Sequence, residues 1–309
     1  LTLKNLIKAI LGKKHQPFLY WKHEDKQWEE LRSYTLPFFE KYVNHTELIC
    51  NENDLRRVTK QIRCDAYIVG SDQVWRKAYT ERWGVEHFFL DFVPSETKKI
   101  AYAASFGLPD MEYNENEIAQ LQELYQRFDA VSVREASCLD IVQRHGWTYP
   151  QAVLVLDPTM LLSIEHYTRL INAGNTVPSK GNLFCYILDE NAEDVNIVKR
   201  IAQERGLLPF YASIQGENRM SVEQWLRSYQ EAEYVITDSY HGVVFSLIFN
   251  KPFYLILNQK RGSARFDSLM KLFSINAGNN SNIIWRHVNE TITEMQRYSI
   301  NYLIGSLEK

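Results

Sequence analysis

From Asp65 onward, short runs of apolar residues alternate with longer segments that have helical periodicity. The apolar runs cover residues 66–69, 88–92, 100–103, 130–133 and 153–156. Between them, residues 117–125 and 135–144 repeat apolar positions at helical spacing, and the second segment closes on His145-Gly146, a typical helix stop. Near-continuous apolar strands separated by helices are typical of a parallel sheet covered on both faces. The pattern therefore predicts an α/β unit.

A second alternation of the same kind follows a polar linker at residues 172–182, which is rich in Gly, Asn, Pro and Ser. Here we predict strands at 183–188, 208–212, 234–237 and 253–257, and helices at 192–205, 222–231 and 243–249. From Trp285 onward one apolar face persists, which predicts a long final helix that crosses back to the first unit. The predicted domains are 1–175, 176–285 and the helix 286–309. Two such α/β units bind ligands where their strands end, in a shared cleft.

Composition and charge narrow the functional classes. The chain has 309 residues and a formal net charge of −3, which gives no general attraction to nucleic acid, whose binding needs a basic stripe. No apolar run approaches the ~18 residues of a transmembrane helix. The four cysteines are scattered and the histidines have no metal-ligand spacing, so we predict no disulfide framework and no metal site. These features favour a cytoplasmic protein.

The N-terminal segment has apolar residues at helical spacing between residues 3 and 10, with Lys4 and Lys8 off that stripe. We favour a surface helix that packs on a domain. The alternative is a basic amphipathic helix that lies on an anionic membrane, at the inner face of the cell membrane.

The segment 234–253 is the most informative part of the chain. A buried strand runs into Asp238 and Ser239, and a helix is predicted to start near His241-Gly242. Free N–H groups and the positive end of the dipole make a helix start an anion site, and His241 could donate a proton there. The alternative is that Asp238 or Ser239 caps the helix and the histidine merely packs.

Three further segments place polar residues after predicted strands. Ser71, Asp72 and Gln73 form a loop that could hold phosphate or sugar hydroxyls, or could simply be a turn. Arg134 could bind a carboxylate or phosphate, or could pair with an acidic residue at the start of the next helix. Arg265 lies in a loop after a strand, where arginines are often just solvated.

The sequence lacks GxGxxG, GxxxxGK[ST], HExxH and GxSxG, so nicotinamide-, P-loop-, zincin- and hydrolase-type activities lose support. Taken together and in order, a set of motifs resembles the polysaccharide pyruvyl transferase family: residues 68–75, 102–107, 132–135, 156–159, 237–242 and 249–252. The resemblance implies a GT-B-like architecture of two Rossmann-like domains with parallel sheets. It also implies phosphoenolpyruvate as donor, no cofactor, and a bacterial surface glycan or its lipid-linked precursor as acceptor.

Under this resemblance each candidate residue receives a role. His241 is the catalytic acid or phosphate clamp, above the helix start at Gly242, and Asp72 is the base for the attacking hydroxyl. The other predicted substrate-binding residues are Ser71, Gln73, Arg134, Asp238, Ser239 and Arg265. Ser71 and Gln73, together with Asp72, are expected to orient the acceptor sugar, and Arg134 and Arg265 are expected to hold the anions of the donor.

Two departures from the family pattern keep other functions open. Family members usually begin with a strand and a Gly/Asn-rich loop that have no counterpart in this sequence, and Ser239-Tyr240 replaces their usual Arg-Leu. The replacement removes a cationic contact to the donor. The alternatives are therefore a GT-B-like glycosyltransferase that uses a nucleotide-sugar, and a catalytically inactive, glycan-binding family member.

Overall fold

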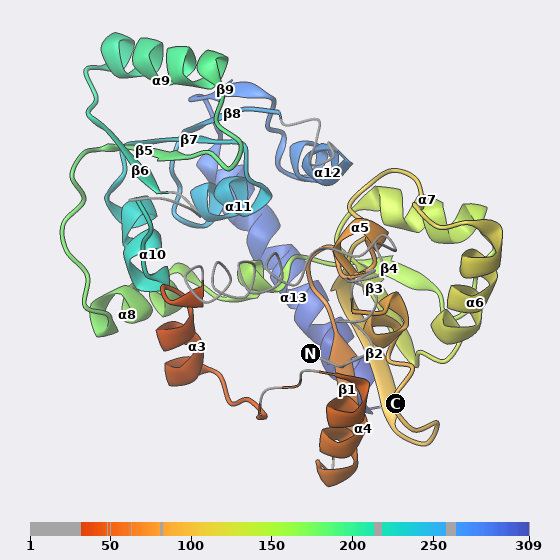
Figure 1. Ribbon diagram of the computed structural model, residues 1–309. Coiled ribbons are helices and arrows are strands. Elements are labelled where there is room, and N and C mark those ends of the chain that lie inside the picture. Colours follow the sequence, from red (N-terminus) through yellow and green to blue (C-terminus); the bar gives the residue numbers. More distant parts are fainter. Residues whose placement is uncertain are drawn as a thin grey trace, which may run out of the picture.

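The computed structural model describes residues 32–47, 49, 51–62, 64–80, 83–212, 218–257 and 264–308. The predicted N-terminal amphipathic helix lies outside these residues. Figure 1 shows two α/β units, each built around its own sheet, joined by residues 155–163 and by the long last helix.

The first sheet is parallel and has the strand order β1-β2-β3-β4. Its strands are β1 (Ala66–Val69), β2 (Lys98–Ala104), β3 (Ala130–Val133) and β4 (Ala152–Leu154). The flanking helices are α4 (Glu52–Gln61), α5 (Lys77–Thr80), α6 (Glu115–Tyr125) and α7 (Ala136–Arg144), and α3 (Leu36–Tyr42) precedes them. In α6, the side chain of Asn114 and that of Glu117 cap each other's backbone N–H groups, which starts the helix before the predicted residue 117.

The second sheet has the order β6-β5-β7-β8-β9, parallel except at its last strand. It consists of β5 (Leu183–Tyr186), β6 (Pro209–Ala212), β7 (Tyr234–Thr237), β8 (Phe253–Leu255) and the antiparallel β9 (Gly278–Asn280). The helices of this part are α8 (Ile164–Ala173), α9 (Ala192–Arg205), α10 (Val222–Glu231), α11 (Tyr240–Ile248) and α12 (Ala264–Phe273). β9, α8 and α12 were absent from the sequence prediction.

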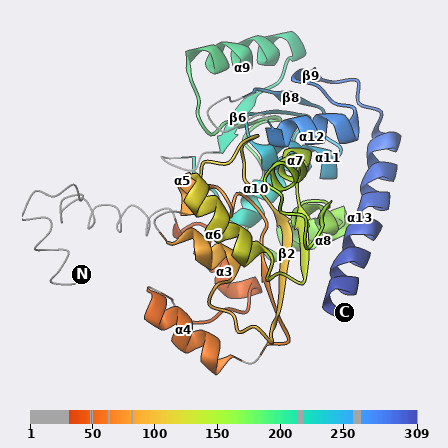
Figure 2. The same cartoon turned by 90° about the vertical axis from the view of Figure 1, so that its right-hand side faces the viewer.

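The helix α13 (Trp285–Glu308) runs along one side of the molecule past both sheets (Figure 2). Val288 is buried in the core of the second unit, whereas Tyr302 packs against buried residues of β2. The Leu156 N–H donates to Ser299 Oγ at 3.0 Å, and Lys98 Nζ donates to the Leu307 carbonyl oxygen at 2.6 Å. The predicted crossing back to the first unit is thus confirmed, as is the α/β class with two sheets.

The apolar run at 88–92, predicted as a strand, is instead part of the 3₁₀ helix η1 (Val85–Phe89) and a following turn. The physical reason is Trp75, which is completely buried. Phe89 stacks on its indole ring at 4.9 Å, and the indole N–H donates to the Phe88 carbonyl oxygen at 3.0 Å. The aromatic residues therefore serve to enclose one tryptophan rather than to pair with a neighbouring strand.

A charged cluster where the two units meet

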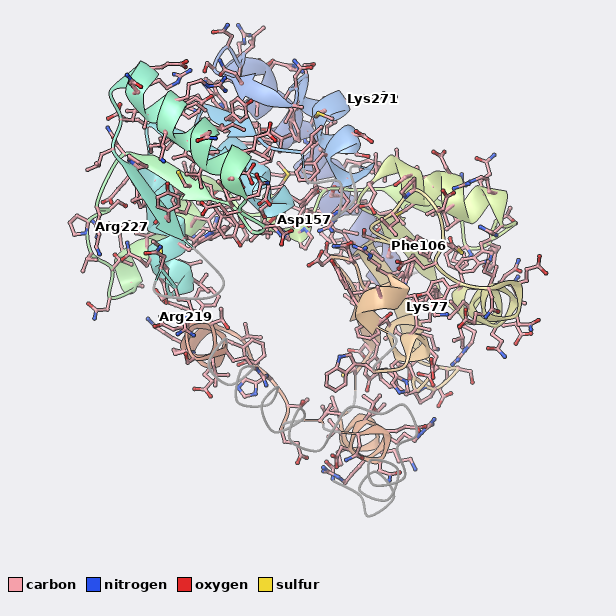
Figure 3. The ribbon with its side chains drawn as sticks, turned by 45° about the horizontal axis from the view of Figure 1, so that its top comes forward. Lys77, Phe106, Asp157, Arg219, Arg227 and Lys271 are labelled. Atoms are coloured by element: carbon pink, nitrogen blue, oxygen red, sulfur yellow. The ribbon has the colours of Figure 1, made fainter. Side chains whose placement is uncertain are left out.

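The ends of the strands bring six residues from both units to one place, here called the charged cluster: Asp72, Arg134, Asp157, Tyr240, His241 and Arg265. Asp72, Arg134 and Asp157 follow β1, β3 and β4 of the first sheet. Tyr240 and His241 open α11 after β7, and Arg265 lies in the first turn of α12. Figure 3 shows Asp157 at the junction of the two units.

Arg134 is the centre of this cluster, and its side chain is fully buried. Its Nη1 donates to Asp157 Oδ2 at 2.7 Å and its Nη2 to Asp72 Oδ1 at 3.0 Å, while Nε lies 3.6 Å from Glu135 Oε2. Burial by itself would lower the pKa of Arg134, but Tyr240 and the three carboxylates outweigh it and raise that pKa. The sequence left open whether Arg134 pairs with an acid or binds a ligand, and the structure pairs it with acids from three segments.

Asp157 links the two units. Its Oδ2 accepts from Arg134 and lies 3.6 Å from His241 Nε2, while its Oδ1 accepts from the N–H and the hydroxyl of Thr159. Burial favours the neutral acid, but His241 and Arg134 outweigh it and hold the pKa of Asp157 far below its ordinary range. A buried carboxylate fixed in this way places a negative charge beside the His241 ring, whose side chain is one-third exposed.

Asp72 presents a carboxylate to solvent at the rim of the cluster, because its side chain is 63% exposed. Partial burial would raise its pKa, yet Arg134 and His241 lower it, so Asp72 is ionised near neutral pH. The preceding loop begins at Gly70, where a Cβ atom would lie 2.0 Å from the Tyr102 carbonyl oxygen. A glycine is therefore required to bring this loop against β2.

The two neighbours of Asp72 have different positions. Ser71 Oγ lies 3.1 Å from the Ala103 carbonyl oxygen and 3.2 Å from Asp157 Oδ2, two acceptors that share its one hydroxyl proton, so it belongs to the rim of the cluster. Gln73 is buried, and its Oε1 accepts from Arg76 Nη1 at 3.0 Å. Its amide therefore supports the loop from the side of α5.

The start of α11 is held by hydrogen bonds from backbone N–H groups to side chains and by close packing. Ser239 is the N-cap residue, and its hydroxyl accepts from the Gly242 N–H at 3.3 Å. Asp238 accepts from the N–H groups of Leu188 and Asp189 at 2.7 and 3.2 Å, which anchors the loop after β5. A Cβ atom on Gly242 would lie 2.0 Å from Thr237 Oγ1, so this glycine allows α11 to sit tightly on the end of β7.

Tyr240 and His241 are the first two residues of α11, and their backbone N–H groups have no acceptor within the helix. The positive end of the α11 dipole therefore lies beside the His241 ring. Arg265, 6% exposed, adds a second guanidinium group, 5.7 Å from the centroid of the Tyr240 ring. Burial, and after it the like charge of Arg134, lowers the pKa of Arg265.

Chemically, the cluster offers an imidazole, an exposed carboxylate, a helix start and two guanidinium groups.

Within the described ranges, no group of three or more His, Cys, Asp or Glu side chains is placed to hold a metal ion. No helix among those residues is both long and apolar enough to cross a membrane.

Sequence reasoning underestimated two members of the cluster. Asp157 lies in the motif at 156–159 but received no role of its own, and it is the carboxylate that lies beside both Arg134 and His241. Tyr240 was noted only as a replacement within a motif. Its position next to the predicted helix start indicated that Tyr240 lies near the site. That two arginines contact its ring could not be predicted, because this depends on how the units pack.

The architecture and the cluster define an α/β protein of two facing units with its polar residues at the carboxyl ends of the strands, which is where open α/β sheets bind ligands. A family model described as polysaccharide pyruvyl transferase matches residues 3–260. The chain therefore belongs to the polysaccharide pyruvyl transferase family.

Other comparisons are distant. No curated protein matches the chain. Among solved structures, the UDP-N-acetylglucosamine 2-epimerase from Rickettsia bellii is similar at 8% identity and a TM-score of 0.45, with 92% of this chain and 87% of that chain covered. At this level of similarity, nothing about activity transfers to the chain.

Proposed function

We propose that the protein transfers the pyruvyl group of phosphoenolpyruvate to a sugar of a bacterial surface polysaccharide or its lipid-linked precursor, forming a ketal. The observation that supports this most is the His241–Asp157 pair, in which a proton donor from the second unit faces a buried carboxylate of the first. An exposed, ionised carboxylate, Asp72, lies at the same cluster. The family membership supports the same reaction class.

In the proposed reaction, His241 delivers a proton to the methylene carbon of the donor, which becomes a methyl group and leaves an oxocarbenium-like carbon. Asp72 accepts the proton of a sugar hydroxyl as its oxygen forms a bond to that carbon. A second sugar hydroxyl then displaces the phosphate, its proton leaving with the phosphate. One donor and one diol therefore give one ketal and one inorganic phosphate.

The remaining residues of the cluster support this chemistry. The N–H groups at the start of α11 and the Arg265 guanidinium offer positive charge to the carboxylate and phosphate of the donor. Arg134 orients the carboxylates of Asp72 and Asp157 instead of binding the donor directly, because its guanidinium is buried between them. Ser71 completes the acceptor rim. Gln73, Asp238 and Ser239 hold the loops in place, and Gly242 allows the close approach of α11 to β7.

In this proposal, the unit of the first sheet forms the acceptor side and the unit of the second sheet the donor side, with the last helix joining them. The predicted boundary at residue 175 moves to a position before α8, because Tyr167 and Ile171 of that helix pack in the core of the second unit. The protein acts in the cytoplasm, where phosphoenolpyruvate is available, and approaches a lipid-linked acceptor at the inner face of the membrane. For the acceptor side, Tyr79 and Trp83 offer exposed rings, 49% and 57% accessible, on which a sugar could stack.

The first test is thermal unfolding of the protein with and without millimolar phosphoenolpyruvate, with phosphate and UDP-sugars as comparison ligands. A ligand at 100 times its Kd stabilises the folded state by about 2.7 kcal/mol, which shifts the melting temperature measurably. We expect a shift that is specific to phosphoenolpyruvate. In a phosphate-release assay with glycan acceptors, His241→Ala should reduce turnover by about 10²–10⁴-fold without lowering the unliganded melting temperature.

Each other outcome favours a different function. A shift with nucleotides alone would favour a glycosyltransferase that uses a nucleotide-sugar. No shift with any of these ligands would favour a glycan-binding protein without donor chemistry, and a fully active His241→Ala protein would remove His241 from the mechanism.

A further inference from the structure

Tyr240 lies where the two units meet, and its ring contacts a guanidinium group from each of them. The residue is 5% exposed and is the first residue of α11. The guanidinium carbon of Arg134, which follows β3, lies 4.4 Å from the ring centroid. That of Arg265, in α12, lies 5.7 Å from the same centroid. An aromatic face attracts cations at such distances, so one ring stabilises both side chains.

The charges around the ring show why the second cation matters. Arg134 faces three carboxylates, those of Asp72, Asp157 and Glu135, and its positive charge is already neutralised by them. A donor with both a carboxylate and a phosphate needs positive charge beyond this. Ser239 supplies none, because its neutral hydroxyl caps α11.

Arg265 supplies that charge, but its position is electrostatically unfavourable. It is almost completely buried, and it lies close enough to Arg134 for the two positive charges to repel. A buried cation needs a compensating partner to stay in place. The carboxylates of Glu135 and Asp72 compensate part of this cost, and the π face of Tyr240, which is directed to both guanidinium groups, adds to them.

We propose that Tyr240 is a positioning residue that holds the Arg265 guanidinium at the charged cluster, where it binds an anionic group of the donor. The inference rests on the proposed use of phosphoenolpyruvate. It assigns to α12 the cationic contact that the hydroxyl of Ser239 cannot make.

The test is the Kd of phosphoenolpyruvate, measured by titration calorimetry on the wild-type protein and on matched variants. Tyr240→Leu removes the π face and should weaken binding about tenfold, within the range of a buried cation–π contact. Tyr240→Phe keeps the ring and should bind within about twofold of wild type. Tyr298→Leu makes the same chemical change at an exposed position of α13 and should leave the Kd unchanged.

A mutant cycle separates positioning from general damage to the fold. Arg265→Gln should weaken binding as much as Tyr240→Leu does, and the double variant should be little worse than either single one, because both changes remove one contact. Adding Ser239→Arg to Tyr240→Leu should restore part of the affinity by supplying a cation from α11.

The outcomes distinguish the two proposals. If the wild-type protein does not bind phosphoenolpyruvate, the proposed function fails and this inference fails with it. If the wild type binds the donor but Tyr240→Leu binds equally well, or if the two losses are additive in the double variant, Tyr240 does not position Arg265 and the proposed function still stands. If Tyr240→Leu does not fold, equal binding by wild type and Arg265→Gln overturns the inference.

Discussion

The two halves of the charged cluster are held in place by different forces. The half from the first sheet is a network of ion pairs: the buried Arg134 joins Asp72, Asp157 and Glu135. The half from the second sheet rests on close packing and on hydrogen bonds between neutral side chains and the backbone, with Ser239 capping α11 and Gly242 against Thr237. The first half is therefore sensitive to charge and the second to volume. The two halves meet at the contacts of Asp157 with His241 and of Arg134 with Tyr240, so a mutation elsewhere in one half should leave most of the other intact.

The largest expected effect on stability comes from removing the centre of the ion-pair half. Arg134→Ala leaves Asp157 and Glu135 buried without their cation, which should lower the free energy of unfolding by about 3–5 kcal/mol. The matched control is Arg144→Ala, whose pair with Asp110 is exposed and should contribute about 0–1 kcal/mol. Urea unfolding of both variants measures the difference. Equal losses of unfolding free energy in the two variants would mean that the buried ion pairs do not stabilise the first half of the cluster.

An intermediate effect should come from adding volume to the packed half. In Gly242→Ala, the new Cβ would overlap Thr237 Oγ1, and the forced shift of α11 should lower the free energy of unfolding by about 1–3 kcal/mol. Gly305→Ala makes the same change in α13, where a Cβ would meet no described heavy atom within 4 Å. There the better helix propensity of alanine should stabilise the protein by up to about 1 kcal/mol. Two changes of the same sign would contradict the packing argument.

The smallest expected effect is the acid sensitivity of the ion-pair half. The pKa of Asp157 is lowered in the folded protein, so its contribution to stability is complete above its unfolded pKa of about 3.9 and is lost as the pH falls below that value. Asp157→Asn should therefore flatten the decline of the unfolding free energy between about pH 4 and pH 2. Asp110→Asn, at an exposed ion pair, serves as the control. If the unfolding free energy of Asp157→Asn declines with falling pH as steeply as that of the wild type, other carboxylates cause the acid sensitivity.

The sequence predicted the local elements of both units but not how their side chains converge. Strands such as Ala66–Val69 and Tyr234–Thr237 were predicted with their observed bounds, because buried parallel strands are short apolar runs between helices. The placement of Asp72, Arg134 and His241 at the ends of strands followed from the same pattern. Their convergence required knowledge of how the two units face each other, which no local periodicity contains.

The errors have equally specific causes. The run at 88–92 is apolar because it encloses Trp75, and periodicity alone does not separate such a run from a strand. The edge strand Gly278–Asn280 has the sequence Gly-Asn-Asn, and these residues have low strand propensity, so its pairing with β8 depends on tertiary contacts. The helical cap by Ser239 was one of two interpretations that the sequence left open.

The path of α13 has a consequence for how the protein is made. The first sheet is complete early in synthesis, yet Leu156 and Lys98 of its unit bond to α13, which leaves the ribosome after both sheets. The apolar surface around Tyr102 and Val155 of the first unit therefore stays uncovered until Tyr302 and Leu303 have been synthesised. The nascent chain should accordingly need chaperones until a late stage of translation. Deletions within α13 should destabilise the first unit, although that unit is translated first.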